Sequence, residues 1–204
     1  MNAGFGPQSY WDQRFAGEHW VYGEQPNDFL TSCSQELSAG RALCLAEGEG
    51  RNAVFLAEQG HQVCAQDISP IGLRKAEQLA QRRGVHITTL CCDLAEFDPE
   101  PASFDLIVAI WMHLEPELRA AVHQRAIQAL RPGGHLLMEA YSPRQLGFSS
   151  GGPTRLELLI EPAQLQQELS TLQPLLLQEV ERVINEGRAH QGRSAVVQFF
   201  GRKQ

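Results

Sequence analysis

A short glycine-containing turn is the part of the sequence best suited to chemistry. Residues 43–52 read L-C-L-A-E-G-E-G-R-N, an apolar strand that passes through the turn directly into a helix. Gly48 and Gly50 let a ligand approach backbone atoms, and the first N–H groups of the helix are open to it. Asp67 follows about twenty residues later, at the end of the next apolar run, where a ribose-binding carboxylate is expected. Together these residues predict a site for a nucleoside-containing cofactor.

Alternating strands and helices surround this turn. Ser69 and Pro70 form a helix start, with Ser69 as N-cap, and Gly84 ends that helix. After the strand that begins at Ala42, the predicted elements are helix 51–59, strand 62–66, helix 70–83, strand 86–92, strand 104–110, helix 116–130 and, after a turn at 131–134, strand 135–141. Such alternation indicates right-handed crossovers and a parallel sheet covered on both faces.

The end of the chain follows a different pattern. A loop at 142–154 and a short helix at 162–169 precede two predicted strands, 175–184 and 194–201. Because only residues 185–193 join these strands, they should pair antiparallel. We therefore predict an α/β fold, a doubly wound, mostly parallel seven-stranded sheet with a C-terminal antiparallel hairpin.

Length and composition narrow the classes of protein further. With 204 residues and 43% hydrophobic residues, a single domain over 1–204 is expected. The net charge of -7 disfavours nucleic acid as a partner. The five cysteines form no C-x-x-C pair and no zinc-like cluster, so we expect no metal site and a reducing cytoplasm, with Cys44, Cys64 and the Cys91–Cys92 pair acting as small buried hydrophobes. No apolar run is long enough for a membrane span, and the N-terminus does not resemble a signal peptide.

Several motifs together resemble one enzyme family. They are A-E-G-E-G-R-N (46–52), Asp67, Asp93, F-D-L-I-V-A-I (104–110), L-R-P-G-G (130–134) and the terminal strand pair. This succession resembles the class I S-adenosylmethionine-dependent methyltransferases, with their Rossmann-like fold. The segments W-D-Q-R-F (11–15), V-Y-G-E-Q-P-N-D-F-L (21–30) and E-G-R-A-H-Q-G (186–192) look like the small bacterial branch of tellurite-resistance and thiopurine methyltransferases.

The turn departs from the family pattern D-x-G-x-G-x-G in two places. Cys44 stands where the family has an acid, and Ala46 replaces the first glycine. Cofactor binding therefore depends on Gly48, Gly50 and their backbone. Glu47, in the same turn, can partly replace the missing carboxylate beside the ammonium group of the cofactor.

The resemblance implies a set of residues that bind S-adenosylmethionine and its product S-adenosylhomocysteine. Asp67 is expected to bind both ribose hydroxyls, although it can equally cap the helix that follows. Asp93 is expected to accept from the adenine amino group, with Leu94 near the ring, unless it is a solvated loop acid. The full set expected at the cofactor is Trp11, Tyr22, Ala46, Glu47, Gly48, Gly50, Asn52, Asp67, Ile68, Asp93, Leu94 and Ile110.

The N-terminal residues 1–40 are aromatic-rich and irregular, and we interpret them as a lid over a cofactor-binding core at 41–141. Aromatic faces attract a sulfonium cation, which gives Trp11 and Tyr22 a role there, but both can instead pack against the sheet.

Residues 142–204 are assigned to the hairpin and the acceptor side. Ile110, Trp111 and Met112 are expected to form the floor of the site, and Tyr141 and Arg144 can face the acceptor. His113 is the candidate base, with a weaker case for His190, and each can equally be plain polar surface.

We expect methyl transfer to a small-molecule acceptor, a soft nucleophile such as a thiol or a metalloid oxyanion, because alignment alone can provide most of the acceleration. Two alternatives stay open. A nicotinamide-dependent oxidoreductase shares the sheet but has a third glycine, G-x-G-x-x-G, which is missing here. A protein that binds S-adenosylmethionine or S-adenosylhomocysteine without turnover is compatible with Cys44 and Ala46.

Overall fold

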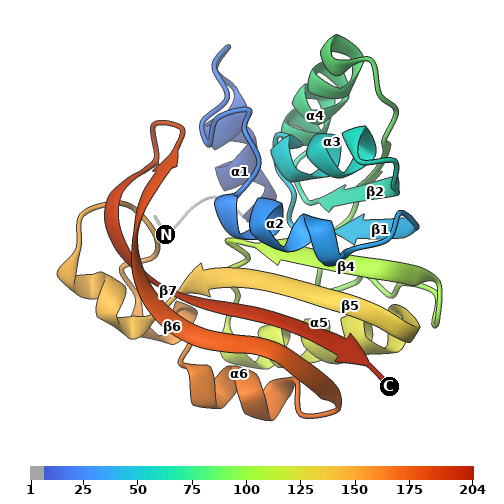
Figure 1. Cartoon of the computed structure of the whole chain (residues 1–204). Helices are drawn as coiled ribbons and strands as arrows, with labels where there is room; N and C mark the ends of the chain where they lie inside the picture. Colours follow the sequence, from blue (N-terminus) through green and yellow to red (C-terminus); the bar gives the residue numbers. More distant parts are fainter. Residues whose placement is uncertain (1–6) are drawn as a thin grey trace.

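The computed structural model describes residues 7–204 and contains a seven-stranded sheet with helices on both faces (Figure 1). The strand order is β3-β2-β1-β4-β5-β7-β6. The strands are β1 (Arg41–Cys44), β2 (Gln62–Asp67), β3 (Thr88–Cys91), β4 (Phe104–Ile110), β5 (Leu130–Tyr141), β6 (Leu172–Glu186) and β7 (His190–Lys203). Strands β1 to β5 pair in parallel, while β7 is antiparallel to both β5 and β6. The predicted fold class is confirmed.

Six α-helices and three 3₁₀ turns accompany the strands in the described chain. They are α1 (Pro7–Phe15), α2 (Asp28–Cys33), η1 (Ser34–Glu36), α3 (Arg51–Glu58), α4 (Pro70–Arg83), α5 (Pro116–Ala129), η2 (Pro143–Gly147), η3 (Leu156–Leu158) and α6 (Pro162–Glu168). Helix α4 has the predicted ends. The Ser69 hydroxyl accepts from the Gly72 N–H at 3.1 Å, and Gly84 ends the helix with φ of 70°.

Each face of the sheet has its own apolar core, as the alternation along β1 illustrates. Ala42 and Cys44 pack with α2, α3 and α4, whereas Leu43 and Leu45 pack with α5 and α6 (Figure 1). This alternation follows from the two-residue repeat of a strand. Because helices cover both faces, the central strand β4 is a nearly continuous apolar run, F-D-L-I-V-A-I.

The N-terminal region is more regular than its sequence predicts. Residues 1–6 lie outside the described residues, but α1 and α2 are helical, and Asn27 caps α2 by accepting from the Leu30 N–H. The expectation of an irregular segment is therefore wrong for these stretches. Helix α1 has one fully buried side chain, Phe15, so its sequence carries little helical periodicity.

The C-terminal hairpin is longer than predicted. Pairing extends from Leu172 opposite Lys203 to Glu186 opposite His190, which leaves only residues 187–189 as the connection. Backbone hydrogen bonds continue the ladder beyond the apolar runs that mark a strand in the sequence. Strand β5 likewise begins at Leu130, and the predicted turn at 131–134 is an irregular part of that strand, where the pairing with β4 shifts register.

Within residues 7–204, no helix has both the length and the apolar character needed to cross a membrane.

Candidate functional site

The carboxyl ends of β1 and β4 lie side by side at the centre of the sheet. Helix α3 follows β1 and helix α5 follows β4, and the two helices cover opposite faces (Figure 1). Ligands of open α/β sheets bind at such a point, where neighbouring strands lead to opposite faces. The structure brings the predicted turn and Asp67 together at this edge.

The turn between β1 and α3 needs its glycines for protein packing. Gly48 and Gly50 have positive φ angles of 63° and 91°. A Cβ atom on Gly48 would lie 3.0 Å from the Phe15 ring, and one on Gly50 would lie 2.4 Å from the Ala76 Cβ. Protein atoms therefore occupy the space beside both Cα atoms, and binding of a cofactor to the backbone of these glycines stays a prediction. Ala46, also at positive φ, donates its N–H to the Gln66 side chain.

Glu47 binds the start of helix α3. Its Oε1 accepts from the backbone N–H groups of Asn52 and Ala53 at 2.9 and 2.8 Å. Burial raises the pKa of this carboxyl to about 7, against the lowering effect of those hydrogen bonds. The carboxylate thus joins the turn to the first residues of helix α3.

Asp67 links the turn to the next helix. Its Oδ2 accepts from the Gly48 N–H and its Oδ1 from the Ser69 N–H, both at 2.8 Å. Burial, with the side chain only 5% exposed, raises the pKa of Asp67 to about 6. Ser69 caps helix α4, so Asp67 binds the N–H of the capping residue and does not itself cap the helix. Each Asp67 oxygen keeps a second acceptor site.

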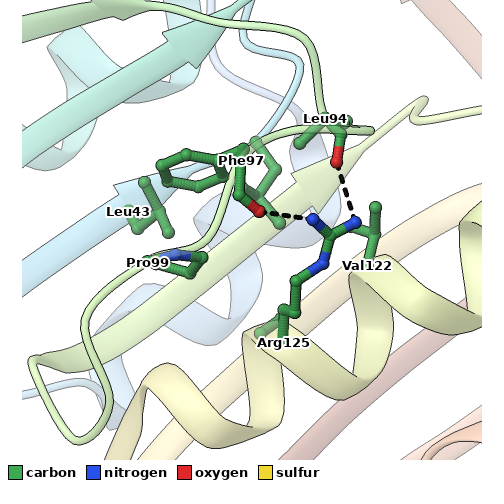
Figure 2. Close-up of a pocket in the computed structure, with 8 residues that line it drawn as sticks. Leu43, Leu94, Phe97, Pro99, Val122 and Arg125 are labelled. Atoms are coloured by element: carbon green, nitrogen blue, oxygen red, sulfur yellow. Dashed lines mark hydrogen bonds between the residues drawn. The ribbon is translucent and has the colours of Figure 1, made fainter.

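Asp93 and Leu94 follow strand β3. The Asp93 side chain accepts from the Ala95 N–H at 2.8 Å and remains half-buried. Leu94 instead lies in the core with Leu43 and Val122, and Figure 2 shows these side chains lining a small pocket. The pocket has a volume of about 10 Å³, enough for one water molecule. Arg125 closes this region by donating to the Leu94 carbonyl at 2.8 Å. The Leu94 side chain therefore belongs to the core in this structure. Ile68, after β2, is half-buried.

Helix α1 covers the glycine turn through a residue that sequence reasoning missed. The buried Phe15 ring lies against Gly48 and Gly72, and Trp11 stacks on Phe15 with centroids 5.5 Å apart. Asp12 accepts from the Ser69 hydroxyl at 2.5 Å. Trp11 is thus one ring removed from the turn. The W-D-Q-R-F motif could have indicated this contact, because its final residue, Phe15, is the buried aromatic side chain of the helix.

A buried ionic cluster, which we call the hairpin ion cluster, joins the starts of α2 and α3 to strands β5 and β6. It consists of Asn27, Arg51, Glu139, Arg182 and Glu186. Arg51 reaches Glu186 at 2.5 Å, and Arg182 donates to both Glu139 and Glu186. Asn27 donates to both carboxylates as well. Sequence reasoning missed this cluster, because its members are far apart along the chain.

Asn52 is tied to the same region. Its Oδ1 accepts from the Asn27 backbone N–H at 2.9 Å. This oxygen therefore holds the start of α2 in the structure, rather than standing open beside the turn.

Strand β4 ends in a group of rings. Ile110 is buried in the core, Met112 is buried on the opposite face, and Trp111 has a positive φ of 58°. Trp111 donates its indole N–H to Glu186 at 2.7 Å and stacks on Tyr141 with centroids 4.5 Å apart. A tryptophan in this backbone region is strained, and such strain is concentrated at functional sites.

His113 extends this stack. Its Nδ1 lies 3.1 Å from the Leu158 carbonyl, so Nδ1 carries the hydrogen and Nε2 presents a lone pair. Burial lowers the pKa of His113 to about 4 and keeps the imidazole neutral. Its Nε2 is buried without a hydrogen-bond partner among residues 7–204.

His190 lies on the other side of the ring group. It contacts Tyr22 at a centroid distance of 4.7 Å and Trp111 at 5.1 Å, and burial lowers its pKa to about 3. Tyr22 therefore lies with the rings at the ends of β4 and β5, and it also accepts a hydrogen bond from Arg14 at 3.3 Å. Arg144 is exposed and pairs with Glu181, so its expected position facing the acceptor is not observed.

The cysteines are only partly as expected. Cys44 is fully buried, but Cys91 is exposed and Cys92 half-buried, because β3 is an edge strand of four residues. The prediction that the Cys91–Cys92 pair is core is wrong. Within the described chain, no group of three or more His, Cys, Asp or Glu side chains is arranged to hold a metal ion.

Comparisons with known proteins show a similarity to methyltransferases. Residues 42–134 match the family model described as a methyltransferase domain. The 2-heptyl-1-hydroxyquinolin-4(1H)-one methyltransferase of Mycobacteroides abscessus is 25% identical over 145 residues, covering 70% of this chain and 64% of that protein. Other relatives are named as methyltransferases of protein N-termini and of tRNA, and the chain spans about half their length.

Solved structures share the fold over nearly the whole chain. A structure described for the conversion of a disulfide bond into a thioacetal group during echinomycin biosynthesis has a TM-score of 0.80 at 17% identity, covering 97% of this chain and 91% of that one. TehB from Haemophilus influenzae has a TM-score of 0.73 at 16% identity, covering 97% and 67%. The [4+2]-cyclase SpnF has a TM-score of 0.70 at 18% identity, covering 96% and 92%. The chain therefore has the fold of these structures, and residues 42–134 are similar to a methyltransferase domain.

Proposed function

We propose that this chain binds S-adenosylmethionine at the carboxyl edge of β1, β2 and β3 and transfers its methyl group to a small molecule. The observation that carries this proposal is the bond from the Gly48 N–H to Asp67, which fixes a glycine turn and a ribose-type carboxylate at one point. Residues 41–141 would hold the cofactor, residues 142–204 would supply the acceptor side, and the N-terminal segment to residue 40 would act as the lid.

The buried carboxylates fit a nucleoside. The hydrogen bonds of Asp67 come from two backbone N–H groups, and its raised pKa reflects burial without a cation to balance its charge. Ribose hydroxyls are donors that would stabilise this carboxylate through its remaining acceptor sites. Asp93 would accept from adenine, and Trp11 and Phe15 would cover the cofactor.

Bound S-adenosylmethionine supplies an activated methyl group. A lone pair of the acceptor forms the bond to the methyl carbon, the carbon–sulfur bond breaks with its electron pair left on sulfur, and the acceptor loses its proton. The contribution of the protein is to align the acceptor and to keep water away from it. Trp111 and Tyr141 would do both.

We further propose that the acceptor is a soft nucleophile, a thiol or a metalloid oxyanion, as in the tellurite-resistance and thiopurine branch. The W-D-Q-R-F segment and the likeness to TehB support this assignment. The net charge of -7 argues against a nucleic-acid acceptor. The five free cysteines support a reducing compartment, such as the cytoplasm.

A second candidate is binding of the cofactor without methyl transfer. Cys44 and Ala46 depart from the family turn, and the fold is shared with a [4+2]-cyclase, so the fold alone does not require methyl transfer. The nicotinamide alternative has less support, because β7 runs antiparallel and the turn lacks the third glycine.

Calorimetry with S-adenosylmethionine, S-adenosylhomocysteine and NAD tests the proposal. We expect the first two to bind and NAD to fail. Transfer of a labelled methyl group to a panel of thiols and metalloid oxyanions then separates an enzyme from a binding protein. Binding of NAD alone, or complete inactivity on every acceptor, would count against the proposed function.

A further inference from the structure

Four aromatic side chains form one continuous group at the ends of β4 and β5 and the start of β7. We call Trp111, His113, Tyr141 and His190 the acceptor cluster. Tyr141 stacks on Trp111 and on His113 with centroids 4.5 and 5.5 Å apart, and it meets His190 edge to face at 5.4 Å. Flat rings in these orientations form a surface suited to another planar ring.

The cluster contains polar atoms without partners. Eight buried side-chain N or O atoms lack a hydrogen bond among residues 7–204, and three belong to the cluster, namely His113 Nε2, Tyr141 Oη and His190 Nδ1. The hydroxyl of Ser142, next to Tyr141, is a fourth. Because an unpaired buried polar group is costly, this concentration indicates that a ligand, with any accompanying water, completes the hydrogen bonds.

The charges beside the cluster are already balanced. Arg51 and Arg182 both bind the carboxylate of Glu186, and Arg119 is paired with Glu168. Arg14 is the exception, and its contact here is with Tyr22, through a hydrogen bond and the face of the ring. Both histidines are held neutral by burial. The four rings therefore offer an anion no cation of their own, and Arg14 lies outside the cluster, exposed and against Tyr22.

A glycine loop covers the cluster. A Cβ atom on Gly152 would lie 2.6 Å from the Tyr141 ring, and one on Gly151 would lie 2.3 Å from the Ala189 carbonyl and 2.9 Å from the His190 ring. The loop is held through Ser150, which is bonded to Gln145 and Ser194. Displacement of this loop would open the unpaired atoms to a ligand.

We infer that the acceptor cluster binds the methyl acceptor, and that this acceptor is an uncharged planar ring bearing an acidic hydroxyl or thiol group. This inference rests on the proposed function and selects between its two acceptor classes, because no cation belongs to the cluster to hold an oxyanion. The proton lost by the acceptor passes to the lone pair of His113 Nε2 and then to solvent. Because His113 is a weak base, the acidic hydroxyl or thiol of a ring suits it better than an aliphatic alcohol.

Two steps on the full-length chain test the inference. First, calorimetry establishes binding of S-adenosylhomocysteine. The loaded protein is then titrated at about pH 6 with 4-methylthiophenol, which stays mostly protonated there, with 1-hydroxyquinolin-4-one and with tellurite. Binding is followed by quenching of tryptophan fluorescence, to which Trp111 contributes. We expect the two ring compounds to bind and tellurite to leave the signal unchanged.

Variants assign the binding to the cluster. Tyr141→Phe removes one unpaired hydroxyl and should weaken ring binding about tenfold. His113→Gln keeps an acceptor near the Nε2 position but removes its basicity, so kcat for the hydroxyl acceptor should fall about 100-fold with little change in KM. His113→Asn, which can still donate to Leu158, serves if the Gln variant does not fold. Tyr10→Phe and His135→Gln are the matched controls, since Tyr10 is exposed and His135 lies at the opposite end of β5.

The possible outcomes are distinct. Tellurite that binds or is methylated as well as the rings would overturn the inference and leave the proposed function intact. Tyr141→Phe and His113→Gln variants that behave like their controls would also overturn it. Absence of S-adenosylhomocysteine binding would overturn the proposed function, and the inference with it.

Discussion

Two groups of buried carboxylates on the same molecule are held in opposite ways. At the turn between β1 and α3 and at the end of β2, which we call the turn half, Glu47 and Asp67 accept from backbone N–H groups. In the hairpin ion cluster, Glu139 and Glu186 bind Arg182, and Glu186 also binds Arg51. Burial raises the pKa values of Glu47 and Asp67, whereas Arg51 and other donors lower the pKa of Glu186 against its own burial.

This difference in partners assigns ligand binding to one group of carboxylates and stability to the other. A carboxylate held only by neutral donors retains a need for further donors, which a ligand can satisfy. A carboxylate inside an ion pair is already neutralised, and removal of either partner leaves a charge buried alone. The turn half is therefore suited to ligand binding, and the hairpin ion cluster fixes the C-terminal hairpin against α2 and α3. Four predictions test this contrast.

The largest effect is expected for Glu186→Ala. Loss of this carboxylate leaves Arg51 and part of Arg182 unpaired, which should lower the free energy of unfolding by about 3–5 kcal/mol. Urea denaturation measures this value. The control is Glu181→Ala on the same strand, whose partners Arg144 and Arg193 are exposed, with a cost below about 1 kcal/mol. Equal costs for the two variants would contradict the assigned role of the ion cluster.

A smaller effect, on ligand binding, is expected for Asp67→Asn. Loss of the charged acceptor should weaken S-adenosylmethionine binding by about 1.5–3 kcal/mol, measured by calorimetry. Asp105→Asn is the matched control, because Asp105 also accepts from a backbone N–H, that of Arg41, but at the amino end of β4. Unchanged affinity in a folded Asp67→Asn variant would refute the ribose role.

The raised pKa of Glu47 predicts a pH-dependent change in stability. The folded protein holds this proton more tightly than the unfolded chain, so ionisation between pH about 4.5 and about 7 reduces the free energy of unfolding. The Glu47→Gln variant has no carboxyl group to ionise, so its free energy of unfolding does not fall for this reason. The stability of the variant relative to the parent should therefore rise by about 1–2 kcal/mol between pH 5 and pH 8.

Glu168→Gln is the control for that series. Its ion pairs lower the pKa of Glu168 to about 2, so its contribution is present above about pH 4.5 and is lost only as the pH falls toward 2. The difference between this variant and the parent should stay constant from pH 5 to 8. A slope equal to that of Glu47→Gln would contradict the contrast between the two groups.

The smallest effect is expected for Trp11→Ala. If the ring contributes a cation–π contact to the sulfonium, affinity for S-adenosylmethionine should fall by about 0.5–1 kcal/mol, with a smaller loss for uncharged S-adenosylhomocysteine. Tyr10→Ala, an exposed ring on the same helix, should change neither affinity. Equal losses for both ligands would show that Trp11 acts by packing alone.

Local patterns in the sequence predicted the framework of this protein. Three of these patterns depend only on neighbouring residues: the apolar run at β4, the Ser69–Pro70 helix start and the short link between the last two strands. The structure confirms the strand, the helix start and the antiparallel pair that they predicted. Element ends were less predictable, because backbone pairing extends β6 and β7 beyond their apolar residues and a register shift alters the start of β5.

The sequence by itself determined the order of strands and helices, and with it the edge where the turn and Asp67 meet, since strand direction and crossover handedness follow from local chemistry. Only the tertiary structure decided which side chains share that edge. Phe15 fills the space beside Gly48, and Glu186 reaches Arg51 across 135 positions of the chain. Such contacts depend on the packing of distant elements, and no spacing along the sequence encodes them.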